Sequence, residues 1–120
     1  MRVKDAVGRF GEDLAIAHLR AAGCQIVQRN WRCPDGEIDI VAIEGDALVF
    51  VEVKTRSTSA FGHPAEAVTP AKAARVRRLA ARWLAENRGG PSWPQLRFDV
   101  VAVTRLAPGG PVISHLRGAF

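Results

Sequence analysis

The segment 48–55, with the sequence LVFVEVKT, constrains the fold more than any other part of the chain. Side chains alternate between the two faces of a β-strand, so Leu48 and Phe50 share one face while Val49 and Val51 share the other. Apolar residues on both faces are typical of a central strand that is covered on both sides. We therefore expect a sheet with this strand inside it and helices packed against its two faces.

One covering helix is expected near the start of the chain, over residues 5–22. Apolar residues recur there at helical spacing, at Phe10, Leu14, Ala17 and Ala21. Ala15, Leu19 and Ala22 flank this stripe, so the spacing predicts a helix with one apolar side toward the sheet.

A second helix is expected to begin at Pro70. Thr69 and Pro70 are a typical N-cap and first helical residue. An apolar stripe of helical period then continues to about Asn87, at Val76, Leu79, Ala80, Trp83 and Leu84.

Apolar alternation between turn residues predicts the remaining strands. They cover residues 24–31, 37–43, 96–104 and 111–116, with the first and last at the edges of the sheet. The order helix, three strands, helix, two strands favours an α/β fold in which a mixed sheet is flanked by helices. A chain of 120 residues has the size of one compact domain, so we expect residues 1–120 to form a single domain.

The charge balance suggests a polyanionic partner. Lysine and arginine number 17 against 12 acidic residues, for a net charge of +5. Most of these basic residues are arginine, whose guanidinium group can contact a phosphate through two hydrogen bonds. A genome rich in GC codons would produce the same bias toward Ala, Arg, Gly and Pro. Composition alone leaves both explanations open.

Targeting signals are not apparent in the sequence. The longest strongly apolar stretch, residues 48–53, already contains Glu52 and is far shorter than the roughly 20 residues of a membrane span. The first residues lack the apolar core of a secretory signal. Cys24 and Cys33 form no CxxC motif, and we read them as free thiols. We expect a cytoplasmic protein that does not enter a membrane.

Acidic residues interrupt two apolar strands that are joined by a tight turn. Glu37 and Asp39 share one strand face, as do Glu52 and Lys54 on the next strand. A symmetric turn centred on residues 45–46 pairs Asp39 with Glu52 and Glu37 with Lys54. Carboxylates directly opposite one another on a sheet repel, so this arrangement needs a compensating cation.

A divalent cation between Asp39 and Glu52 would convert that repulsion into a binding site. Mg²⁺ suits it best, with Mn²⁺ as an alternative, because Mg²⁺ takes one or two carboxylates and keeps several waters. The carbonyl of Val53 would be a further ligand. Such a centre supports phosphodiester hydrolysis, with Lys54 orienting the attacking water. Glu12 and Glu37 are accessory candidates. The alternative is a plain surface pair of Glu37 with Lys54, with Asp39 solvated.

The motifs GEID at 36–39 and FVEVKTR at 50–56 resemble the PD-(D/E)xK nuclease core. More closely, the chain resembles the bacterial YraN-type family of predicted endonucleases, which is related to Holliday junction resolvases. The resemblance implies a restriction-endonuclease-like fold. It also implies Asp39 and Glu52 as metal ligands, Lys54 as the catalytic lysine and Glu12 as an accessory acid.

Basic residues near these motifs are candidates for nucleic-acid contact. Arg75, Arg78 and Arg82 would form a ridge on the second helix, with a merely solvated helix face as the alternative. Lys72 lies on the apolar side of that helix and would reach toward the sheet. Arg56 and Ser57 follow Lys54 directly and are placed for phosphate contact.

Other charged and histidine residues outside the acidic motifs are interpreted as structural. Arg97 and Asp99 share a strand face and read as a structural ion pair. The three histidines have no metal-ligand spacing and read as ordinary residues.

These patterns lead to one main hypothesis and two rivals. The main one is a Mg²⁺-dependent endonuclease acting on DNA, including branched DNA. The first rival is a nucleic-acid-binding module that keeps a nuclease-like fold without useful turnover, and the second is a protein-interaction domain. Because so small a domain has little surface for a branched duplex, we also consider a homodimer.

Overall fold

The computed structural model describes residues 3–57 and 68–120, with side chains from residue 6 onward. Its elements are α1 (Val3–Ala21), β1 (Gln25–Cys33), β2 (Gly36–Glu44), β3 (Ala47–Arg56), α2 (Pro70–Glu86), β4 (Gln95–Thr104) and β5 (Val112–Leu116). The predicted element order and the expected α/β fold class are confirmed. None of the helices in the described ranges is long and apolar enough to cross a membrane.

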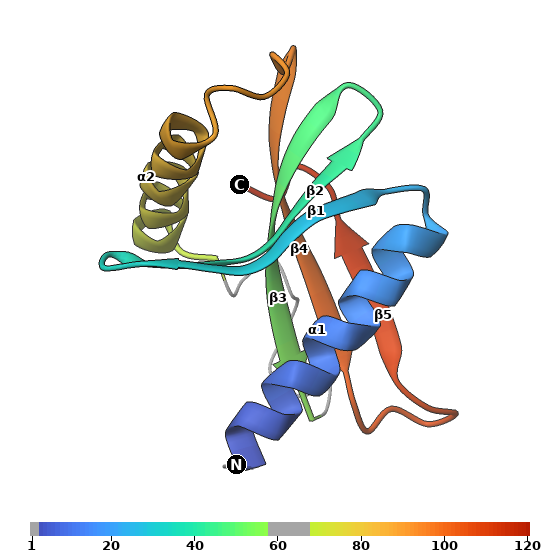
Figure 1. The fold of residues 1–120 in the computed structure, drawn as a ribbon. Coiled ribbons are helices and arrows are strands. Elements are labelled where there is room, and N and C mark those ends of the chain that lie inside the picture. The colour runs from blue at the N-terminus through green and yellow to red at the C-terminus, as the bar shows by residue number, and fades with distance from the viewer. Residues whose placement is uncertain (1–2, 58–67) are drawn as a thin grey trace.

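The strands form one five-stranded sheet in the order β1-β2-β3-β4-β5 (Figure 1). Three neighbouring pairs are antiparallel, and β3 and β4 are parallel from Ala47 beside Gln95 to Arg56 beside Thr104. A parallel pair needs a long crossover connection, and α2 lies within the one between β3 and β4. The sheet is therefore mixed and flanked by two helices, an arrangement compatible with a restriction-endonuclease-like fold.

Strand β3 lies at the centre of the molecule, as its sequence predicts. Val49 and Val51 belong to the apolar core beneath α1, whereas Leu48 and Phe50 belong to the core beneath α2. All four side chains are buried. Helix α1 crosses one side of the sheet, and the far end of the β1–β2 hairpin extends under α2 (Figure 1).

Helix α2 begins and packs as predicted. The Thr69 hydroxyl oxygen accepts a hydrogen bond from the main-chain N–H of Lys72 over 3.2 Å, which caps the helix. Its buried residues are Val76, Leu79, Ala80 and Trp83.

The buried face of α1 differs from the predicted one. Phe10 is 38% exposed and Ala17 and Ala21 are exposed, whereas Leu14 packs against the core as predicted. The buried residues of α1 are Gly11, Ala15, Ile16 and Leu19. The reason lies at Gly11, where an added Cβ would overlap the Thr55 hydroxyl and lie 2.9 Å from the Thr55 Cβ. The buried stripe is therefore rotated from the predicted one toward its flanking residues Ala15 and Leu19, because the helix approaches β3 through a residue without a side chain.

We expect Gly11→Ala to destabilise the protein by about 1–3 kcal/mol, because α1 would have to move away from β3. Gly8→Ala, one turn earlier, is the matched control, since a Cβ there meets nothing within 4 Å. That change should leave stability equal or higher, because alanine favours a helix over glycine by about 1 kcal/mol. Urea unfolding measures both, and equal stabilities of the two variants would contradict this account of the α1 position.

Candidate functional site

The site begins where β2 and β3 separate. In the described residues the two strands pair from Glu44 beside Ala47 to Ile40 beside Val51, in the predicted register. One residue farther, the Asp39 Oδ2 atom accepts a hydrogen bond from the main-chain N–H of Val53 over 2.8 Å. The Asp39 side chain thus takes the place of a main-chain partner at the point where the ladder ends.

The predicted strand pairs Asp39–Glu52 and Glu37–Lys54 do not form, because the ladder between β2 and β3 ends at Ile40 beside Val51. Glu37 is paired with Arg32 of β1, and its Oε2 lies 3.2 Å from the Arg32 Nε. Glu37 is also largely exposed. The alternative of a plain surface pair between Glu37 and Lys54 is therefore wrong.

A cavity of about 700 Å³ opens at the separation of the strands. Its lining comes from α1, β2 and β3 and includes all of the predicted catalytic and accessory residues: Glu12, Glu37, Asp39, Glu52 and Lys54. These five residues, which are up to 42 positions apart in the sequence, therefore line one cavity.

Asp39 is the most perturbed carboxyl group in this cavity. Burial and the nearby charge of Glu52 raise the pKa of Asp39 from 3.8 to about 7. The hydrogen bond from Val53 acts in the opposite direction, and the charges of Glu12 and Glu37 add to the rise. The cavity therefore holds more negative charge than its surroundings compensate.

Glu52 is held by two lysines through a single oxygen atom. The Lys72 Nζ lies 2.7 Å from the Glu52 Oε1, and the Lys54 Nζ lies 3.8 Å from the same atom. The neighbouring Lys72 ammonium group, followed by burial, lowers the pKa of Lys54. Burial alone would lower the pKa of Lys72, but its contact with Glu52 raises it. The site thus favours the charged form of Lys72 more than that of Lys54.

Glu12 reaches the cavity from α1. Its Oε1 atom is buried and has no hydrogen-bond partner among the described residues, and the nearest cation is the Arg29 Nη2 at 3.7 Å. Burial is the main cause that raises the pKa of Glu12. A buried acceptor without a donor is expensive, so this oxygen is a natural contact for a cation or an ordered water.

The donors in the cavity fit a hard divalent cation with few protein ligands. Among the described residues no three His, Cys, Asp or Glu side chains form a metal cluster. Asp39 and Glu52 would supply two carboxylates, and Glu12 has the unpartnered oxygen just described. Mg²⁺ commonly binds in this way, with waters filling the remaining positions.

The predicted nucleic-acid contacts fall into two groups. Lys72, Arg56 and Ser57 lie at or next to the cavity, because Lys72 pairs with Glu52 and the other two continue from β3. The second group is the exposed set Arg75, Arg78 and Arg82 on α2. Arg82 already pairs with Asp35 over 3.2 Å, so this ridge is partly neutralised.

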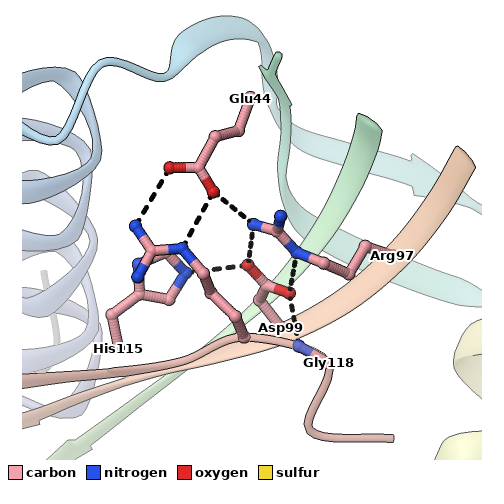
Figure 2. A network of polar contacts seen from close by, with 6 residues as sticks. Glu44, Arg97, Asp99, His115 and Gly118 are labelled. Carbon is pink, nitrogen blue, oxygen red and sulfur yellow. Dashed lines mark hydrogen bonds and ion pairs between the residues drawn. The ribbon is translucent and has the colours of Figure 1, made fainter. Parts of the chain in front are cut away.

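A second polar network lies at the end of the sheet beneath the C-terminus of α1, and it joins β2, β4 and β5 (Figure 2). Asp99 is fully buried and bonds Arg97, the His115 Nε2 at 2.7 Å and the main-chain N–H of Gly118. Glu44 binds Arg97 and Arg117 from the other side.

The predicted pair of Arg97 and Asp99 is confirmed, but the sequence gives no sign that His115 is its third member. Only the antiparallel pairing of β4 with β5, which sets His115 beside Val101, brings His115 next to Asp99. Since every oxygen of Asp99 is satisfied, we read this network as structural.

Comparison with known proteins places the chain in a family. Residues 11–103 match the family described as "Uncharacterised protein family UPF0102". The chain belongs to this family. A UPF0102 protein of Beutenbergia cavernae is 59% identical over 118 residues, which is 98% of each chain. A UPF0102 protein of Frankia alni is 61% identical over 121 residues, covering 100% of this chain and 98% of the relative.

The family match covers every residue of the cavity that bears on chemistry. Glu12, Asp39, Glu52 and Lys54 all lie within the matched range 11–103, as does Lys72 on α2. The family description assigns no activity, so the chemistry must be argued from the cavity itself.

The raised pKa of Asp39 predicts a pH-dependent stability without divalent metal. The folded state holds this proton up to about pH 7, whereas the unfolded chain loses it near pH 3.8, so stability falls as the pH rises between these values. Asp39→Asn removes this penalty but can still accept the hydrogen bond from Val53. In EDTA, the variant should gain stability over wild type by on the order of 2 kcal/mol between pH 4 and pH 8.

The control is Asp46→Asn, which changes an exposed aspartate in the turn between β2 and β3. Its difference from wild type should stay constant over the same range in chemical denaturation. Parallel curves for wild type and Asp39→Asn would show that the site does not repel the charge of Asp39.

Proposed function

We propose that this protein is a Mg²⁺-dependent endonuclease that hydrolyses phosphodiester bonds in DNA. The observation that carries the proposal is the juxtaposition of Asp39, Glu52 and Lys54 around one cavity at the point where β2 and β3 separate. The resemblance of GEID and FVEVKTR to the nuclease core points to the same three residues.

In the proposed mechanism Asp39 and Glu52 hold the metal ion. When bound, Mg²⁺ polarises a phosphoryl oxygen and lowers the pKa of a bound water. The hydrogen bond from Val53 fixes the orientation of the Asp39 carboxylate. Lys54 lines the cavity with its Nζ 3.8 Å from the Glu52 Oε1, where it would orient the attacking water and offset the negative charge that develops on the phosphate.

The substrate class follows from charge. With a net charge of +5, the chain carries basic residues both beside the cavity, at Arg56 and Lys72, and along α2, at Arg75 and Arg78. We propose that these residues contact the phosphate backbone of DNA, including branched DNA, in the cytoplasm. The homodimer stays a prediction, which a monomer at micromolar concentration in analytical ultracentrifugation would contradict.

A second candidate is a nucleic-acid-binding module without turnover. The contact between Lys72 and Glu52 favours it, because this contact already compensates one of the two carboxylates without any metal. The module predicts DNA binding that weakens with salt and no cleavage that depends on metal.

The deciding experiment incubates the purified protein with branched, duplex and single-stranded DNA in Mg²⁺ or Mn²⁺. We expect cleavage that EDTA abolishes and that falls at least about 100-fold in Asp39→Asn, Glu52→Gln and Lys54→Met. Asp46→Asn, which removes an equal charge outside the cavity, should cleave like wild type.

Two results would contradict the endonuclease proposal. Cleavage that survives in Asp39→Asn or Glu52→Gln would place the chemistry elsewhere or in a contaminant. Salt-sensitive binding of the same DNA without any cleavage would favour the binding module instead.

A further inference from the structure

The Glu52 oxygen that the proposed function assigns to a metal ion already has a cation. The Lys72 Nζ lies 2.7 Å from the Glu52 Oε1, a distance typical of a charge-assisted hydrogen bond. Both side chains are largely buried, with 18% and 15% of their surfaces exposed. This contact is therefore less screened by solvent than a surface ion pair would be.

Asp39 has no such counter-ion. Among the described residues its carboxylate is within ion-pair distance of no lysine, arginine or histidine, and the bond that it accepts comes from the Val53 N–H. Of the two facing carboxylates, only Glu52 is neutralised. The two carboxyl groups thus differ, because Glu52 has a lysine counter-ion and Asp39 has none.

Lys72 is placed to leave this position without disturbing the fold. Its main-chain N–H donates to the Thr69 cap, which fixes the first turn of α2. Its ammonium group is at the end of a flexible four-carbon stem, so the side chain can change rotamer while the helix stays in place. A displaced ammonium would remain within the reach of its side chain from Glu52, which lines the cavity.

We propose that Lys72 is the resident counter-ion of Glu52, which a divalent cation must displace from the site, and that the freed ammonium then binds the substrate phosphate. The inference rests on the proposed function. An ammonium group and a divalent cation on the same carboxylate oxygen would repel each other strongly in a partly buried site. Lys72 thus acts as a positioning residue that makes metal binding weak without DNA and stronger with it.

The test compares metal binding by wild type and Lys72→Met, which keeps the apolar stem but removes the charge. Calorimetric titration with MgCl₂ should give a dissociation constant at least about fivefold lower for Lys72→Met, because no cation has to be displaced. In EDTA the melting temperature of the variant should fall below that of wild type, and saturating Mg²⁺ should raise it by more than it raises wild type.

Two controls separate this role from a structural one. Lys72→Arg keeps a cation at the position and should bind Mg²⁺ as wild type does. Arg88→Met removes one exposed positive charge just beyond the C-terminus of α2, at the opposite end of the helix from Lys72, and should also leave the Mg²⁺ affinity unchanged. If Lys72→Met had only a structural effect, it would lower the melting temperature without tightening Mg²⁺ binding. Should Lys72→Met fail to fold, Lys72→Gln provides the same comparison.

The outcomes distinguish the inference from the function on which it rests. If wild type binds Mg²⁺ and Lys72→Met binds it equally or more weakly, the counter-ion role is overturned while the metal site stands. If neither protein binds Mg²⁺ or Mn²⁺ at millimolar concentration, both the role of Lys72 and the proposed nuclease chemistry are overturned.

Discussion

The hydrogen bond between the Asp39 carboxylate and the Val53 N–H is the interaction on which the site depends. It lies where the ladder between β2 and β3 ends, so a side chain satisfies a main-chain donor that the neighbouring strand no longer reaches. The same bond holds Asp39 near Glu52, although two carboxylates in a partly buried cavity repel each other. Acidic side chains are thus concentrated where the pairing of β2 and β3 ends, although the protein as a whole has a net positive charge.

The two helices place further charged residues around these mutually repelling carboxyl groups. Helix α1 approaches β3 closely because Gly11 has no side chain, and this approach brings Glu12 into the cavity. Helix α2 begins at Pro70 under the Thr69 cap, which places Lys72 against Glu52. The buried network around Asp99 ties β4 to β5 and the chain end, away from the cavity. Both carboxylate oxygens of Asp99 are hydrogen-bonded, whereas the cavity keeps charged groups that a ligand can contact.

Much of the architecture could be predicted because it depends on local periodicity and on one hairpin register. The two-sided apolar pattern of β3 and the turn at residues 45–46 were enough to bring Asp39 next to Glu52. What could not be predicted depends on non-local geometry. The rotation of α1 follows from one close contact with Thr55, and the absence of the Glu37–Lys54 pair follows from the end of the β2–β3 ladder at Ile40 and Val51. The place of His115 beside Asp99 required the pairing of β4 with β5.

The central claim is that Asp39 and Glu52 together hold a divalent cation. Isothermal titration of Mg²⁺ into wild type and Asp39→Asn tests it without any assumption about substrate. The account predicts one binding event in wild type and an affinity at least tenfold lower in Asp39→Asn, with the variant as well folded as wild type by circular dichroism. Equal Mg²⁺ binding by the two proteins would contradict it, as would the absence of Mg²⁺ binding in both wild type and Lys72→Met.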